Sequence, residues 1–155
     1  MTTRRVENYL GKEGILSSQL EGFEYRSQQM DMAGAVEKAF DNAKHLIVEA
    51  GTGTGKSLAY LIPAILWAVE NNKKVVISTY TKTLQHQLLN HDIPFLRDKL
   101  GINFRYALCM GNENYLSLRR LKRSAQAGLF TQKNEENQWE GIFNWAEETE
   151  TGFRS

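Results

Sequence analysis

The feature that most constrains this chain is a run of alternating glycines at residues 49–57, with the sequence EAGTGTGKS. A short apolar run at 46–48 precedes it, and an apolar, helix-compatible run at 58–69 follows it. A strand, a glycine-rich turn and a helix in this order are typical of a phosphate-binding loop. The glycines leave backbone N–H groups free to face a polyphosphate, and the helix adds the positive end of its dipole. We therefore predict a nucleotide-binding site at this loop.

Two side chains of the loop are candidates to bind the phosphates and their metal ion. We expect the Lys56 ammonium to meet the β- and γ-phosphates and the Ser57 hydroxyl to ligate Mg²⁺, so these two residues are the catalytic candidates. The strict pattern has glycine where this chain has Ala50, the smallest substitute. The alternative is a flexible loop with an accidental Lys-Ser pair, and the alternating glycines with their flanking runs disfavour it. The predicted phosphate-binding residues are Ala50, Gly51, Thr52, Gly53, Thr54, Gly55, Lys56 and Ser57.

The composition is that of an ordinary globular protein. The 155 residues suffice for one modest domain, with 41% hydrophobic and 24% charged residues. A net charge of +1 means that any nucleic-acid binding must come from local patches. The single cysteine, Cys109, excludes an intrachain disulfide and suits a reducing cytoplasm. We see no signal peptide, and the run at 58–69 is too short to span a bilayer, so we expect a cytoplasmic protein with no membrane partner.

Apolar spacing separates helices from strands along the chain. Helical spacing predicts helices over about 28–43, 58–69, 84–90, 95–100 and 114–128, and a last one near 139–146. Unbroken apolar runs predict strands near 45–49, 74–79 and 104–110. Helices and strands in alternation predict an α/β fold with a parallel sheet and right-handed crossovers. Residues 1–20 are weakly patterned, and we expect most of them to form a frayed terminal helix.

Two places offer groups suited to a nucleic-acid backbone. Hydroxyls and a lysine at 79–83 follow the second predicted strand, and ligands of open α/β sheets bind at that edge. A plain Ser/Thr helix cap is the alternative there, and both interpretations can hold. The helix predicted over 114–128 carries the strongest basic cluster, residues 119–123. Phosphate contacts and a solvated helix face explain this cluster about equally well.

Four stretches together resemble the amino-terminal part of the XPD/DinG-like superfamily 2 DNA helicases. Residues 23–33 are similar to their Q motif, and residues 49–57 to motif I. Residues 78–88 are similar to motif Ia, and residues 110–121 to a segment that carries K-G-R-x-N-Y-L-C-x-R-R-L in the family. The resemblance covers roughly residues 22–121, and the order and spacing of the motifs make it more specific than motif I alone.

The resemblance implies an ATP-dependent motor that moves 5′ to 3′ on single-stranded DNA in repair or replication. It implies a P-loop NTPase fold with a partial RecA-like parallel sheet flanked by helices, and ATP and Mg²⁺ as cofactors. Arg26 and Gln29 are expected to flank the adenine. The expected DNA contacts are Thr79, Thr81, Lys82, Gln85, Arg119 and Arg120. The implied domains are a lead-in at 1–22, a nucleotide-binding domain at 23–113 and a truncated helical insertion at 114–155.

Departures from the family pattern limit what this chain is expected to do alone. Ser117 stands where the family has its first iron–sulfur cysteine, and with Cys109 as the only thiol we expect no iron–sulfur cluster. No Asp-Glu-x-His sequence follows residue 60, and the second motor lobe is missing. We therefore expect a fragment that binds nucleotide without efficient hydrolysis, with the remainder of the motor as partner. The alternatives are a non-catalytic nucleotide- or DNA-binding fragment, or another P-loop NTPase or kinase.

Overall fold

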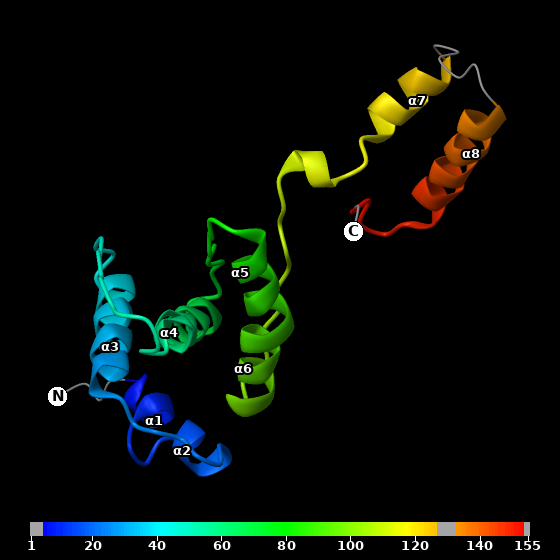
Figure 1. Ribbon diagram of the computed structural model, residues 1–155. Coiled ribbons are helices and arrows are strands. Elements are labelled where there is room, and N and C mark those ends of the chain that lie inside the picture. The colour runs from blue at the N-terminus through cyan, green and yellow to red at the C-terminus, as the bar shows by residue number, and fades with distance from the viewer. Residues whose placement is uncertain (1–4, 127–132, 154–155) are drawn as a thin grey trace. The chain divides into compact units, whose positions relative to one another are not determined.

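The computed structural model describes residues 5–126 and 133–153. The chain divides into two compact units, Met1–Tyr106 and Ala107–Ser155 (Figure 1). The elements of the first unit are α1 (Glu7–Leu10), α2 (Ile15–Gln19), α3 (Ser27–Asp41), α4 (Lys56–Glu70), α5 (Lys82–Gln87), the π-helix η1 (Leu88–Asp92) and α6 (Ile93–Lys99). Those of the second unit are the 3-10 helix η2 (Asn112–Asn114), α7 (Leu118–Gln126) and α8 (Lys133–Glu148).

Between residues 27 and 99 the helices form where the apolar spacing predicts them. The predictions over 28–43 and 58–69 are confirmed by α3 and α4, which pack against each other. The predictions over 84–90 and 95–100 correspond to α5, η1 and α6, which follow one another without a break. Helix formation depends on hydrogen bonds within one segment, so local spacing is a sufficient guide to it.

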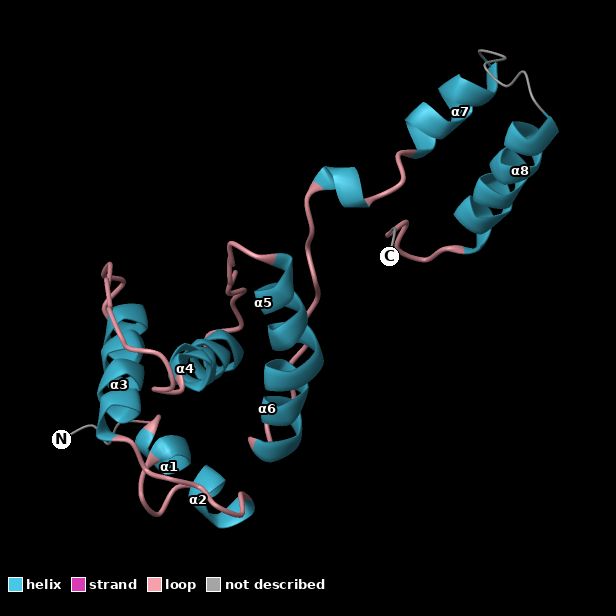
Figure 2. Ribbon diagram, in the orientation of Figure 1, coloured by secondary structure: helices cyan, strands magenta, loops and turns pink. Residues whose placement is uncertain are grey.

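The predicted parallel sheet is wrong. Among residues 5–126 and 133–153 the structure contains no β-strand, and the three runs expected to form strands are loops (Figure 2). In the first two runs the apolar side chains lie largely in solvent, with Ile47 98% exposed and Val76 90% exposed, whereas Met110 in the third run is buried. A strand exists only when a neighbour accepts its backbone hydrogen bonds and covers its faces. These runs carry the composition of strands, but within the described residues no partner pairs with them.

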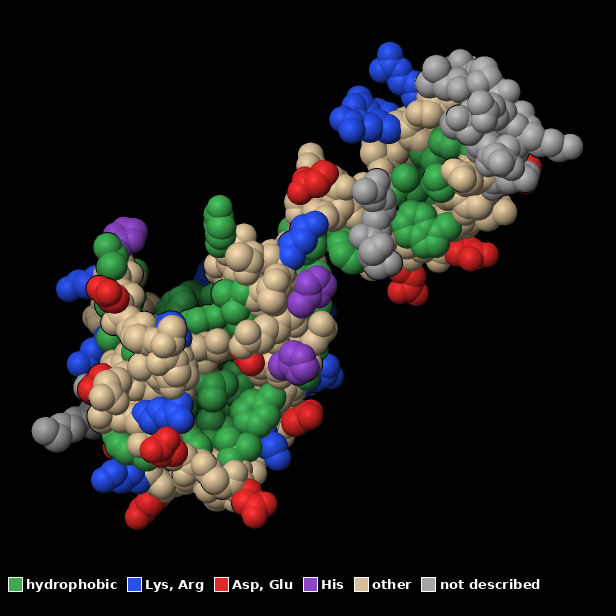
Figure 3. Space-filling model, in the orientation of Figure 1, with side chains coloured by type: hydrophobic (Ala, Val, Ile, Leu, Met, Phe, Trp, Pro, Cys, Tyr) green, Lys and Arg blue, Asp and Glu red, His purple; other side chains and the backbone are tan. Residues whose placement is uncertain are grey.

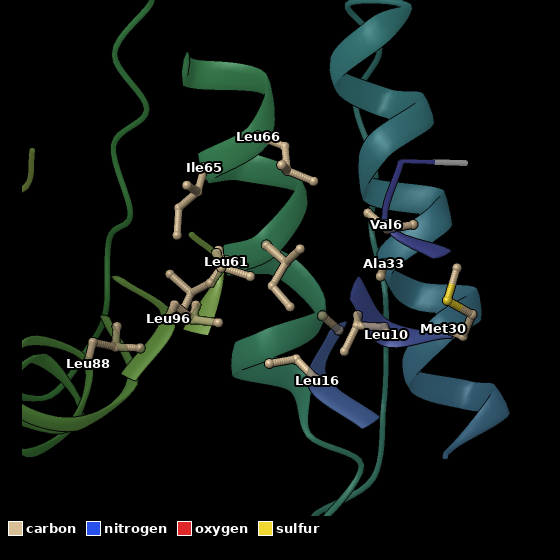
Figure 4. Close-up of a cluster of buried hydrophobic side chains, with 13 residues drawn as sticks. Val6, Leu10, Leu16, Met30, Ala33, Leu61, Ile65, Leu66, Leu88 and Leu96 are labelled. Carbon is tan, nitrogen blue, oxygen red and sulfur yellow. The ribbon is translucent and has the colours of Figure 1, made fainter. Parts of the chain in front are cut away.

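The amino-terminal segment is part of the core, so the expected frayed terminus is wrong. Val6, Leu10 and Leu16 are at most 1% exposed and belong to one hydrophobic cluster with residues of α3 and α4. Figure 4 shows these side chains beside Met30 and Leu61 in one cluster. Burial of a Leu or Val side chain contributes roughly 1.5–3 kcal/mol, which outweighs the weak helix propensity of the segment.

A network of ion pairs joins the ends of α3 and α4. The Arg5 guanidinium bonds Glu37 Oε1 through Nε at 3.2 Å, Asp41 Oδ1 through Nη2 at 2.5 Å, and Glu70 through Nη1. The Val6 amide also donates to Glu37 Oε1, at 3.3 Å. Burial lowers the pKa of Arg5, but the hydrogen bond to Asp41 and the charges of Asp41 and Glu70 outweigh it and leave the pKa raised. The network therefore holds the first residues against both long helices.

The second unit consists of helices and a short closing contact. The Leu116 amide donates to Gly152 O at 2.7 Å, and the Tyr115 and Phe153 rings meet edge to face at 5.8 Å. Helix α7 begins later than the predicted 114, and the predicted end at Gly128 lies outside the described residues. Helix α8 begins at Lys133, before the predicted start near Trp139. In the part of the chain that the structure describes, no helix has the length and apolar character needed to cross a membrane.

Candidate nucleotide-binding site

The glycine-rich loop takes the backbone form that a phosphate cradle requires. Gly53 and Gly55 have φ of +80° and +73°, in the left-handed region that favours glycine. Ala50 lies outside that region, which explains why alanine is tolerated where the strict pattern has glycine. Gly55 is the N-cap of α4, and within the described residues no side chain caps this helix. The first N–H groups of α4 have no intrahelical acceptor, and they are positioned to bind an anion.

The Lys56 side chain lies over the loop. Its Nζ donates to Ala50 O at 2.9 Å and to Gly51 O at 2.6 Å. The Thr54 hydroxyl donates to the same Gly51 carbonyl at 3.0 Å. Two carbonyl oxygens of the loop therefore hold the Lys56 ammonium group in place. A phosphate that entered this cradle would meet a positive charge already held in place.

Arg26 and Gln29 support the loop from α3. Arg26 Nη1 donates to Gly53 O at 2.7 Å, and its Nη2 pairs with Glu24 at 3.1 Å. Gln29 Nε2 donates to Gly55 O at 3.0 Å, and only 6% of Gln29 is exposed. The family resemblance predicts both residues beside the adenine. The structure brings both to the loop and gives each a loop carbonyl as its acceptor.

Ser57 has a neighbour that the sequence reasoning missed. Tyr60 lies three residues further along α4, so it shares a helix face with Ser57. Burial raises the pKa of Tyr60, the nearby Ser57 hydroxyl lowers it, the charge of Asp92 raises it further, and the net shift is upward. The spacing of three residues on a predicted helix was the available signal, because such residues share a face. Asp92 gave no comparable signal, since it comes from a distant helix.

The donor set at the start of α4 fits a phosphate-bound Mg²⁺. A hydroxyl in the first turn beside a lysine is the arrangement that holds this ion in phosphate-loop proteins. Among the described residues no three His, Cys, Asp or Glu side chains converge on a metal site. Ser57 would therefore share the ion with phosphate oxygens and water, which Mg²⁺ accepts readily.

One set of predicted DNA contacts lies around the start of α5. Thr81 caps this helix, because its hydroxyl accepts from the Leu84 amide at 3.2 Å. The Thr79 hydroxyl donates to Thr81 O at 3.3 Å. The helix-cap interpretation is confirmed. Lys82 and Gln85 lie on the first turns of α5, so all four residues belong to one short stretch of the first unit.

Arg119 and Arg120 lie in the second unit, on α7. Both are exposed, as are Lys122 and Arg123, whereas Leu121 on the same helix is buried. Figure 3 shows the basic side chains projecting from α7 into solvent. The two groups of candidate DNA contacts therefore belong to different units.

The sequence around this loop is similar to that of known helicases. The family model described as DEAD/DEAH box helicase matches residues 28–140. The chain is 39% identical over 148 residues to the ATP-dependent DNA helicase YoaA of Haemophilus influenzae, covering 96% of this chain and 22% of that protein. It is 45% identical over 116 residues to YoaA of Escherichia coli, covering 75% of this chain and 18% of that protein.

A third relative carries a different activity in its name. The chain is 34% identical over 148 residues to the 3′-5′ exonuclease DinG of Bacillus subtilis, covering 92% of this chain and 15% of that protein. The chain thus spans about a fifth of the length of these relatives or less.

Proposed function

Because the chain belongs to the DEAD/DEAH box helicases, we propose that it is the ATP-binding part of an ATP-dependent DNA helicase. The observation that carries the proposal is the position of Lys56, whose ammonium lies on the carbonyls of a glycine-rich loop at the start of α4. The names of the YoaA relatives support the helicase activity. We extend the proposal to 5′-to-3′ movement on single-stranded DNA in repair or replication, in the cytoplasm, with the rest of the motor as partner.

Nucleotide binding in this proposal is an exchange of acceptors at Lys56. The phosphates take the hydrogen bonds that Nζ now gives to Ala50 O and Gly51 O. A bond from ammonium to phosphate joins two charges and is roughly twice as strong as one between neutral groups. Thr54 keeps its bond to Gly51 O, so the loop retains its shape during the exchange.

The adenine is proposed to bind beside Arg26 and Gln29. Arg26 is exposed, and its planar guanidinium can stack on a base while Nη1 keeps its bond to Gly53 O. Gln29 has less freedom because it is buried and already holds Gly55 O. Its amide oxygen is the group left to read an exocyclic amine. The two side chains thereby link base recognition to the shape of the phosphate loop.

Mg²⁺ is proposed to bind at Ser57 and to neutralise charge on the β- and γ-phosphates. Hydrolysis also needs a group that positions the attacking water, and no Asp-Glu-x-His sequence follows residue 60. We therefore propose that this chain binds ATP with Mg²⁺ and turns it over poorly by itself.

DNA is proposed to contact the start of α5 through Thr79, Thr81, Lys82 and Gln85. Thr81 is the N-cap of α5 and Thr79 lies two residues before it, so both hydroxyls precede the first turn of the helix, where phosphate oxygens also find free N–H groups. Arg119 and Arg120 on α7 add exposed positive charge in the second unit. Phosphate contacts of this kind fix the strand without reading its sequence.

The experiment is a titration of ATP with Mg²⁺, with phosphate release followed in the same samples with and without single-stranded DNA. Lys56→Ala should weaken binding by roughly tenfold or more, and Lys73→Ala, which removes an exposed lysine just after the C-terminus of α4, is the matched control. Binding lost in Lys56→Ala with little phosphate release supports the proposal.

Other outcomes would point elsewhere. Binding that Lys56→Ala leaves unchanged contradicts the site. Rapid turnover stimulated by DNA contradicts the expected poor hydrolysis. DNA binding without any nucleotide binding favours a non-catalytic fragment. Phosphate transfer to a small acceptor favours another P-loop NTPase or kinase.

A further inference from the structure

The first observation is a short extended segment in front of α3. Arg26, the N-cap of this helix, has φ of −122° and ψ of 113°. Side chains two residues apart on an extended backbone point to the same side, so Glu24 and Arg26 lie together while Tyr25 points away. Tyr25 packs against the hydrophobic core, and the Lys12 ammonium lies over its ring, 5.4 Å from the centroid. The segment is thereby anchored from one side and presents Glu24 and Arg26 on the other.

The second observation is that Glu24 and the phosphate loop hold two edges of the Arg26 guanidinium. Its Nε and Nη2 both donate to Glu24 Oε2, at 3.3 Å and 3.1 Å. Its Nη1 donates to Gly53 O at 2.7 Å. All three nitrogens are therefore engaged, although the Arg26 side chain is 44% exposed. Since a guanidinium donates within its own plane, these bonds engage its edges and not its flat faces.

We propose that Glu24 is a positioning residue that fixes the plane of the Arg26 guanidinium and so prepares it to stack on the adenine of ATP. This inference rests on the proposed function, in which the adenine binds beside Arg26. The bond to Gly53 O alone fixes one corner of the guanidinium, whereas the two bonds to Glu24 also fix its rotation. An arginine side chain has many rotamers, and holding it in one conformation before the ligand arrives reduces the entropic cost of binding.

The charge of Glu24 separates this role from simple electrostatics. A carboxylate repels a polyphosphate, so on charge alone the loss of Glu24 should strengthen the binding of ATP and of inorganic tripolyphosphate alike. A positioning role predicts a loss in the part of the affinity that comes from the base. The Glu24 side chain is 74% exposed, so water screens its pair with Arg26 and the loss should be only a few-fold.

The test compares ATP with inorganic tripolyphosphate, which has no base. Each is titrated onto the protein in Mg²⁺ by calorimetry, and the ratio of the tripolyphosphate Kd to the ATP Kd measures what the nucleoside contributes. Glu24→Ala should reduce this ratio by roughly three- to fivefold. Glu24→Gln, whose amide oxygen still accepts a hydrogen bond, should reduce it less. Glu21→Ala removes an exposed carboxylate three residues earlier and, as the matched control, should leave the ratio unchanged.

A double substitution tests the link through Arg26. Arg26→Ala should reduce the ratio at least as much as Glu24→Ala does, and in that background Glu24→Ala should reduce it no further. A merely structural role for Glu24 would weaken both ligands equally and leave the ratio unchanged. An unchanged or raised ratio in Glu24→Ala, or an equal reduction when Arg26 is already absent, refutes the positioning role while the phosphate site stands. If the unmodified protein shows no binding of either ligand that Lys56→Ala removes, the proposed function and this inference both fail.

Discussion

Replacing Gly55 by alanine tests the geometry of the phosphate loop most directly. Gly55 has φ of +73° and caps α4, and its carbonyl accepts the hydrogen bond from Gln29. A Cβ added to Gly55 would overlap Gln29 Nε2 and lie 3.0 Å from Gln29 Cδ. Because Gln29 is 6% exposed, its side chain has little room to move away. The substitution therefore strains the backbone and also displaces the side chain that supports the loop.

The two effects can be estimated separately. A non-glycine residue in the left-handed region costs roughly 1–2 kcal/mol. Loss of the bond from Gln29 to Gly55 O costs about 1 kcal/mol more. We expect Gly55→Ala to lower the free energy of unfolding by about 2–3 kcal/mol. In a Gln29→Ala background the overlap is gone, and only the backbone cost of roughly 1–2 kcal/mol should remain.

The loop provides its own controls. Gly53 has φ of +80°, but nothing lies within 4 Å of an added Cβ, so Gly53→Ala should cost only the backbone strain of roughly 1–2 kcal/mol. Gly51 has neither a positive φ nor a close neighbour, so Gly51→Ala should change stability by less than about 0.5 kcal/mol. The expected order of destabilisation is Gly55 above Gly53 above Gly51.

The assay is urea unfolding followed by tryptophan fluorescence. Trp67 belongs to the first unit, and Trp139 and Trp145 belong to the second. Changing the latter two to phenylalanine makes Trp67 the reporter of the unit that contains the loop. If Gly55→Ala costs no more than Gly53→Ala, or if Gln29→Ala does not reduce its cost, the proposed contact between Gln29 and the loop is refuted.

Three further predictions concern the same unit. Arg5→Gln should destabilise it by about 2 kcal/mol in urea unfolding, because Glu37 stays buried without its cation, and a loss below about 0.5 kcal/mol would contradict this. Burial, and then the charge of Glu70, raise the pKa of Tyr9 above 10.0, so the folded state holds this proton more tightly than the unfolded state. Stability should be constant with respect to this group below pH 10 and fall as pH rises through the folded pKa, and Tyr9→Phe should flatten the fall; an unchanged slope would refute it. Thr81→Ala should remove the cap of α5 and cost about 1 kcal/mol, seen as faster hydrogen exchange at residues 82–87, with no change expected for Thr83→Ala.

The backbone form of the glycine-rich loop could be predicted from the sequence because it is local. Alternating glycines, a lysine and a serine at fixed spacing specify backbone turns and side-chain roles within nine residues of one another. The positive φ at Gly53 and Gly55 and the position of Lys56 on the loop agree with that prediction. The long helices were predictable for the same reason, since their hydrogen bonds close within each segment.

The parallel sheet could not be predicted correctly, because a strand is not a local structure. Ile47 and Val76 lie in runs with the composition of buried strands, yet they are almost fully exposed. Whether such a run pairs depends on which neighbour is available, and composition does not state this. The prediction for the amino-terminal segment was wrong in the opposite direction. Its apolar residues are weakly patterned in the sequence, yet they include core residues such as Val6 and Leu10.

The sequence by itself determined where the glycine-rich turn lies and where helices α3 and α4 run, because each of these depends on neighbours along the chain. Only the tertiary structure decided that Gln29 and Arg26 hold the carbonyls of the loop and that Arg5 joins three carboxylates. These partners are distant in sequence. Their contacts exist because the burial of apolar side chains packs α3, α4 and η1 together, and hydrogen bonds then form between whatever polar groups that packing brings within reach.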